Sequence, residues 1–160
     1  MQKRYYKKLT LLLVSVSLIL ASCITSPTSD LLEDPSPRQN LSNTSNNVSL
    51  SLDKTTYILP MRTLTFHIHN AGDAVYTYGE FFYIEKEWYM LEIEDSVFDD
   101  FTSFDNYGSR LAPGDKADIK VAMDDYGLTF DKGTYRIVKA FSNKNTGETT
   151  WLEAEFEVID

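Results

Sequence analysis

Hydrophobic and polar residues alternate one by one along short segments of this chain between residues 48 and 160. In the clearest segment, glutamates separate the apolar residues Leu152, Ala154, Phe156 and Val158. Because successive side chains of a β-strand point to opposite faces, this period predicts strands with one face buried and the other in water. Strands are expected at residues 48–52, 63–69, 75–84, 89–93, 117–121, 135–141 and 152–158. No segment has a convincing helical period, so the sequence predicts an all-β chain, an antiparallel two-sheet β-sandwich of about seven strands.

Cysteine is absent from this region, because the only cysteine among the 160 residues is Cys23. An internal disulfide is therefore excluded. The chain is 42% hydrophobic and 13% aromatic, which is enough to build a hydrophobic core without such a bridge. The length predicts a single domain, placed at residues 48–160.

A short motif near the C-terminal end narrows the type of sandwich. Residues 131–137 read Asp-Lys-Gly-Thr-Tyr-Arg-Ile, which resembles the D-x-G-x-Y-x-C stretch of immunoglobulin domains, with Ile137 in the place of the second disulfide cysteine. The span 48–160 is also similar to the bacterial immunoglobulin-like domains of secreted lipoproteins, through pieces that include Tyr57-Ile58-Leu59-Pro60, Leu111-Ala112-Pro113-Gly114 and Gly133-Thr134-Tyr135-Arg136.

The resemblance has structural and functional implications. It implies an Ig-like fold in which Tyr135 forms a corner, its hydroxyl bonding to backbone upstream, with Asp131 and Gly133 as the other structural residues of the motif. The family has no assigned catalytic residues, so the resemblance implies a protein that is not an enzyme.

The first 22 residues have the pattern of a signal peptide. A basic start is followed by an apolar run, Leu9 to Ala21, which as a helix would span about 20 Å, short of the roughly 30 Å bilayer core. The sequence Leu20-Ala21-Ser22-Cys23 resembles the lipobox of bacterial lipoproteins, in which the cysteine receives a lipid and becomes the first residue. The resemblance implies that Cys23 anchors the mature chain to a membrane, either the cell membrane or an outer membrane.

Residues 23–47 are expected to form a flexible stalk after the lipidated cysteine. Ser, Thr, Asn, Asp and Pro dominate this segment, and it has few large apolar residues. Such a composition buries too little surface to offset the entropy lost on folding.

The charge distribution excludes one class of partner. The formal net charge is −9, although four of the first eight residues are basic and the first acidic residue is Asp30. A surface this acidic repels phosphate backbones, so nucleic acid is not expected as a partner. The glutamates on the outer face of the last strand oppose pairing between sheet edges, which favours a monomer.

Candidate metal and catalytic residues are few. His67 and His69 are the only histidines, and their spacing places both on one face of a strand, where they offer zinc two ligands or simply face solvent. The acidic pairs at 99–100, 105–106 and 124–125 offer oxygens to calcium, but none has the EF-hand spacing. No nucleophile motif is present. The sequence therefore predicts no metal, no cofactor and no catalytic residue.

Aromatic residues supply the candidate binding sites. Trp151 belongs to the outward set of the last strand, and exposed aromatic residues are enriched at binding surfaces. The alternative is that Trp151 folds over the edge of the sandwich. A second group lies in the 95–115 connection, which is long enough to be functional but whose spacing also suits a helical lid over the sandwich: Phe98, Phe101, Phe104 and Tyr107.

These features predict an extracytoplasmic, lipid-anchored protein whose Ig-like domain is a non-catalytic interaction module for a protein or another envelope component. Two other functions stay open. One is carbohydrate binding to an envelope glycan through Trp151 or the 98–107 aromatic residues. The other is protease inhibition, with the 95–115 connection inserted into the protease.

Overall fold

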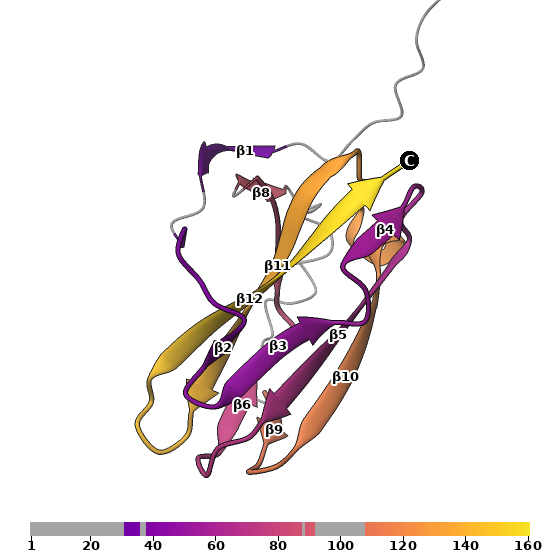
Figure 1. Cartoon of the computed structure of the whole chain (residues 1–160). Helices are drawn as coiled ribbons and strands as arrows, with labels where there is room; N and C mark the ends of the chain where they lie inside the picture. The colour runs from indigo at the N-terminus through magenta and orange to yellow at the C-terminus, as the bar shows by residue number, and fades with distance from the viewer. Residues whose placement is uncertain (1–30, 36–37, 88, 92–107) are drawn as a thin grey trace, which may run out of the picture.

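The computed structural model describes residues 31–35, 38–87, 89–91 and 108–160, and for residues 31–35 and 89–91 it describes the backbone only. Two sheets pack against each other to form a β-sandwich (Figure 1). The predicted all-β sandwich without a disulfide is confirmed. No helix among the described residues has both the length and the apolar character needed to cross a membrane.

The larger sheet has eight strands. Its main path runs β1 (Leu31–Pro35), β8 (Tyr89–Leu91), β7 (Tyr83–Lys86), β11 (Gly133–Asn143), β12 (Thr149–Ile159) and β4 (Thr56–Ile58). The far end of β11 also pairs with β6 (Tyr76–Tyr78), which in turn pairs with β9 (Ser109–Leu111). All of these pairs are antiparallel except β12 with β4, which is parallel.

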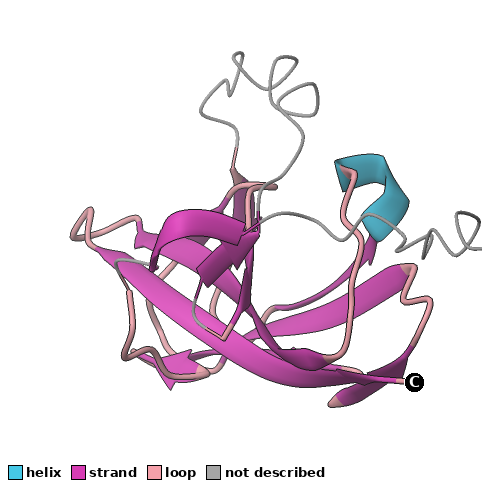
Figure 2. Ribbon diagram, turned by 90° about the horizontal axis from the view of Figure 1, so that it is seen from above, coloured by secondary structure: helices cyan, strands magenta, loops and turns pink. Residues whose placement is uncertain are grey.

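The smaller sheet has four antiparallel strands in the order β10 (Lys116–Ala122), β5 (Thr63–Asn70), β3 (Val48–Leu52) and β2 (Thr44–Ser45). After β10, a single 3-10 turn, η2 (Met123–Tyr126), carries the chain toward the larger sheet. This turn is the one helical element within the described residues (Figure 2).

The expected strands all appear, with two refinements. The segment 75–84 is divided into β6 and β7, separated by the connection 79–82. The short strands β1, β2, β4 and β9 were not predicted, because two to five residues are too few to show a period.

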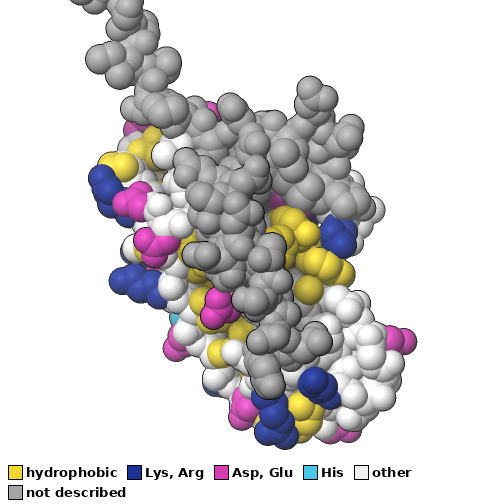
Figure 3. Space-filling view, turned by 180° about the vertical axis from the view of Figure 1, so that it is seen from behind, with side chains coloured by type: hydrophobic (Ala, Val, Ile, Leu, Met, Phe, Trp, Pro, Cys, Tyr) yellow, Lys and Arg dark blue, Asp and Glu magenta, His cyan; other side chains and the backbone are white. Residues whose placement is uncertain are grey.

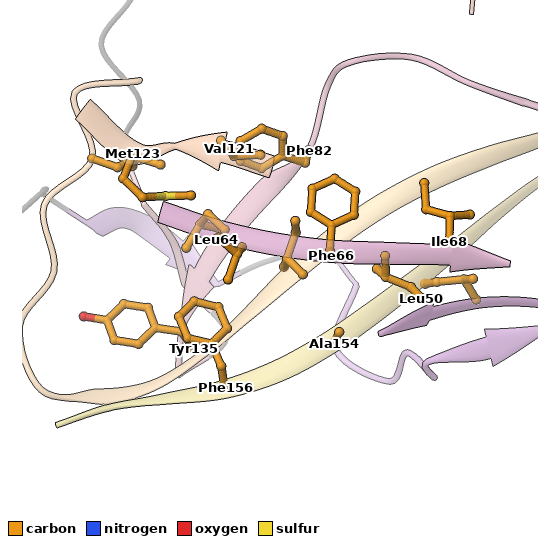
Figure 4. Close-up of a cluster of buried hydrophobic side chains, with 14 of the residues drawn as sticks. Leu50, Leu64, Phe66, Ile68, Phe82, Val121, Met123, Tyr135, Ala154 and Phe156 are labelled. Atoms are coloured by element: carbon orange, nitrogen blue, oxygen red, sulfur yellow. The ribbon is translucent and has the colours of Figure 1, made fainter. Parts of the chain in front are cut away.

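The core lies between the sheets, where the alternating residues of facing strands meet. Leu64, Phe66 and Ile68 of β5 are buried, as the alternation predicts. They pack toward β11 and β12, where Tyr135 stacks on Phe156 with 5.5 Å between ring centroids (Figure 4). These rings dominate the hydrophobic contribution to stability, because each buries a large apolar area.

Residues 38–47 pack against the domain and do not hang free of it. The amide of Leu50 donates to the carbonyl of Asn43, and the amide of Glu153 donates to the carbonyl of Ser42. Thr44 and Ser45 form β2, and β1 pairs with β8. The structure therefore differs here from the expected stalk. The hydrogen bonds use backbone groups, which every residue carries, so the polar composition of the segment does not oppose them.

The motif at 131–137 forms a tyrosine corner. The Tyr135 hydroxyl donates to the carbonyl of Asp131 at 3.0 Å and lies 2.6 Å from its carboxylate. Lys86 pairs with the same carboxylate at 2.6 Å and lowers the pKa of Asp131, together with the bond from Tyr135 and against the effect of its partial burial. The corner thus joins the start of β11 to the end of β7.

Gly133 is required at this corner. Its φ is 153°, a conformation that L side chains rarely adopt, and a Cβ there would lie 2.7 Å from Cε of Lys86. We expect Gly133→Ala to lower the free energy of unfolding by about 1–3 kcal/mol, because the backbone strain adds to the displacement of Lys86.

Urea unfolding followed by circular dichroism measures this loss. Gly147→Ala is the matched control, since Gly147 also has a positive φ, 75°, but a Cβ there meets nothing within 4 Å. Equal losses in the two variants would contradict the role given to the Lys86 contact.

Candidate functional site

The outer face of the larger sheet carries an aromatic cluster. Tyr83 comes from β7 and Trp151 from β12, and both belong to the sets of residues that point away from the core. Their ring centroids lie 5.9 Å apart, and Phe81 meets Tyr83 edge-on at 4.6 Å. The guanidinium of Arg38 lies 3.7 Å from the centroid of the Trp151 ring. We call Phe81, Tyr83, Trp151 and Arg38 the aromatic face.

The rings of the aromatic face are half-buried, so they support one another and still reach solvent. Viewed from behind, hydrophobic side chains gather beside the residues drawn in grey, with charged side chains around the margin of the molecule (Figure 3). An arginine stacked on a tryptophan lowers the mobility of both side chains. The cluster is therefore held together by contacts within the chain itself.

A buried ion network lies next to the aromatic face. Arg136 of β11 is 1% exposed, and its guanidinium bonds to Glu85 at 2.5–2.6 Å and to Glu153 at 2.5 Å. Glu85 and Arg136 are direct cross-strand partners. The same guanidinium donates to the backbone carbonyls of Arg38, at 2.5 Å, and Gln39, at 3.3 Å. Arg136 thus fixes the backbone that carries the Arg38 side chain onto Trp151.

The tryptophan predicted as a binding residue lies on the outer side of β12, as its odd position in the alternation indicated. Tyr83 and Arg38 cover part of its ring, so it is neither fully exposed nor folded into the core. The other predicted aromatic residues, Phe98, Phe101, Phe104 and Tyr107, lie outside the described residues, as does Cys23.

The histidines occupy the outer face of the smaller sheet. His67 Nδ1 lies 2.7 Å from a carboxylate oxygen of Asp118, its cross-strand neighbour on β10. Within the part of the chain that the structure describes, no three His, Cys, Asp or Glu side chains come together to hold a metal ion.

Lys139 is a buried residue that the sequence analysis missed. It is 1% exposed and points to the interior from the centre of β11, where its Nζ donates to the carbonyls of Gly79 at 2.7 Å and Phe81 at 3.0 Å. Burial lowers the pKa of Lys139 from 10.5 to about 8, and the charge of Glu80 opposes this shift. The alternation along β11 places position 139 on the inner face of the strand, so the sequence did contain a signal that this lysine is buried.

Residues 44–157, from β2 to β12, match the family model described as a bacterial Ig-like domain. The chain belongs to the bacterial Ig-like domain family. This assignment indicates a non-catalytic interaction module, of a family whose members are typically extracellular or exposed at the cell surface. The matched span includes Tyr83, Arg136 and Trp151 but begins after Arg38.

Comparisons with individual proteins add little to the bacterial Ig-like assignment. No curated protein matches the chain. Among solved structures, the protein is similar to the Vibrio cholerae VesB protease at 16% sequence identity and a TM-score of 0.39, over 72% of this chain and 32% of that chain. The chain thus spans about a third of the length of that protease chain.

The buried lysine makes stability depend on pH in a defined direction. Between pH 8 and 10.5 the unfolded chain binds a proton that native Lys139 has released, so stability rises with pH over this window. We expect the free energy of unfolding of the wild type, relative to Lys139→Met, to increase by up to about 3 kcal/mol from pH 7 to pH 10.

Urea unfolding of both proteins at the two pH values measures the change. Lys132→Met, at a largely exposed lysine, is the control and is expected to show little pH dependence relative to the wild type. If the free energy of unfolding of the wild type, relative to Lys139→Met, stays constant or falls as the pH rises, burial does not destabilise the charged form of Lys139 and the prediction is contradicted.

Proposed function

We propose that this protein is a membrane-tethered, non-catalytic interaction module that binds a protein partner through the aromatic face. The observation that carries the proposal is the preformed Trp151–Tyr83–Arg38 cluster on the outer face of the larger sheet. Tryptophan, tyrosine and arginine are the residues most enriched among those that dominate binding energy at protein interfaces. Rings that are already held in place lose little side-chain entropy on binding.

The charge around the aromatic face favours a basic partner. Glu155 and Glu157 point outward from β12 on the same side as Trp151, and both are exposed. The chain as a whole carries a formal net charge of −9. Lys and Arg side chains at the rim of a partner would complement these carboxylates and accelerate its association. The expected partner therefore presents an apolar centre bordered by basic residues.

The proposed tether is a lipid on Cys23, following the resemblance of Leu20-Ala21-Ser22-Cys23 to a lipobox. Seven residues lie between Cys23 and Leu31, the first residue of β1, and an extended chain from Cys23 to Leu31 reaches at most about 30 Å. The domain would then lie close to the outer surface of a membrane, and its partner would be another component of the envelope. A protein partner within that distance is reached without a long linker.

The anchor is tested by replacing its cysteine. We expect Cys23→Ala to abolish incorporation of an alkyne-labelled fatty acid and to move the protein out of the membrane fraction, because lipid chains supply the membrane affinity. Labelling and fractionation of cells that express the full-length chain measure both effects. A Cys23→Ala protein that still carries label and sediments with membranes would contradict the lipid anchor.

The binding surface is tested by photo-crosslinking on living cells. A photoreactive amino acid at Thr149, an exposed residue on the same face as Trp151, is expected to give one saturable protein adduct. The same amino acid at Asp118, exposed on the outer face of the smaller sheet, is the control and is expected to give none.

Two further variants assign the adduct to the aromatic face. Trp151→Ala is expected to reduce its yield about tenfold. Glu155→Lys, at an exposed position, is expected to reduce it through charge without disturbing the fold. Equal labelling from Thr149 and Asp118, or a yield that neither variant changes, would contradict binding through this face.

A further inference from the structure

A cavity of about 360 Å³ opens at one side of the sandwich, and its lining includes no residue of the aromatic face. It lies between β10, the edge strand of the smaller sheet, the turn η2, and the 79–82 connection between β6 and β7. Among the described strands, β10 pairs only with β5, so the sandwich is not closed by a further strand on this side. The volume is within the range of small-ligand sites. We call it the β10 cavity.

Lys139 supplies a fixed polar group to the cavity wall. An ammonium carries three N–H donors, and within the described part of the chain two of them are used, by the carbonyls of Gly79 and Phe81. Those two bonds hold the position of Nζ, which also lies 5.5 Å from the centroid of the Tyr78 ring, and no acceptor among the described residues takes its third N–H. A charged side chain that is 99% buried is costly to retain, since an apolar residue of the same size would suit the core better.

Two tyrosines supply apolar surface to the same cavity. Tyr126 of η2 packs edge-on against Phe82, with 5.1 Å between centroids, and Tyr78 of β6 packs against Phe141 at 6.0 Å. Both tyrosines are half-buried, so one part of each ring is held by the core and the rest borders the cavity. Aromatic rings held in this way can contact the C–H face of a ligand.

Carboxylates complete the rim. Glu80 and Asp125 line the cavity from opposite elements, the 79–82 connection and η2, and both are exposed. Burial raises the pKa of Tyr126, and the charges of Glu80 and Asp125 add to this shift. Lys120 of β10 also lines the cavity, so two acidic and two basic side chains surround it.

This combination of groups selects the class of ligand. The two carboxylates disfavour an anion, and the buried ammonium of Lys139 disfavours a cation. A neutral ligand rich in hydroxyl groups can bond to both kinds of side chain, since hydroxyls donate to carboxylates and accept from an ammonium. From the buried donor, the rim acceptors and the tyrosine rings, we propose that the β10 cavity binds a neutral sugar residue of an oligosaccharide. The residues that line this site differ from those of the aromatic face, and the proposal does not depend on the proposed protein partner.

Saturation-transfer NMR and calorimetry on the full-length chain in detergent micelles test the proposal. The probes are cello-, malto-, xylo-, manno- and chitotetraose, with tri-galacturonic acid as an anionic comparison. We expect at least one neutral oligosaccharide to bind saturably and the anionic sugar to bind more weakly. Tyr126→Ala is expected to weaken that binding about tenfold or more, while Tyr126→Phe, which keeps the ring, is expected to weaken it less.

The control is Ile58→Ala, which removes an exposed apolar side chain of β4 outside both the cavity and the aromatic face and is expected to leave sugar affinity within about twofold. If Tyr126→Ala fails to fold, the exposed rim variants Glu80→Ala and Asp125→Ala take its place and are expected to weaken binding. The proposal is overturned if no neutral oligosaccharide binds saturably. It is also overturned if Ile58→Ala weakens binding as much as the cavity variants, or if the anionic sugar binds best.

Discussion

The ion network around Arg136 determines how the N-terminal part of this chain meets the sandwich. Strand β11 is covered on both faces, and Arg136 lies almost fully buried in its outer face. Glu85 and Glu153 compensate the charge, and the carbonyls of Arg38 and Gln39 take further N–H donors of the guanidinium. Removing one partner of a buried charge typically costs about 3–5 kcal/mol. Residues 38 and 39 are therefore held in place by an interaction that the sandwich itself requires.

The Arg136 network also helps to build the aromatic face, the proposed binding surface. The backbone held by Arg136 carries Arg38, whose guanidinium stacks on Trp151. The aromatic face is thus assembled from three segments far apart in the sequence, and an internal ion network fixes one of them. On the inner face of the same strand, beside the β10 cavity, Lys139 holds the 79–82 connection through two backbone carbonyls. Two buried cations of one strand, on opposite faces, thus hold two different segments of backbone.

The sequence predicted those features that depend on local pattern. Alternation identified the inward residues of β5 and β12, and the motif around Tyr135 indicated the tyrosine corner. Arg136 and Lys139 were hidden in the run 135–141, because the burial of a charge depends on partners such as Glu85, Glu153 and the carbonyl of Gly79, which lie far away in sequence. Residues 38–47 were expected to be free because their composition is polar, but many of their contacts are made by backbone groups, which composition does not reveal.

The most direct test of this account is the hydrogen exchange of a single backbone amide. The N–H of Glu153 points away from β11 and donates to the carbonyl of Ser42 at 3.0 Å. If residues 38–47 are part of the fold, this amide is expected to exchange far more slowly than an exposed one, and about as slowly as that of Glu157, which donates to the carbonyl of Thr55 at 2.9 Å. A Glu153 amide that exchanges at the rate of an unstructured peptide, beside a protected Glu157, would show that the segment is a free stalk and would contradict the arrangement described for the outer face.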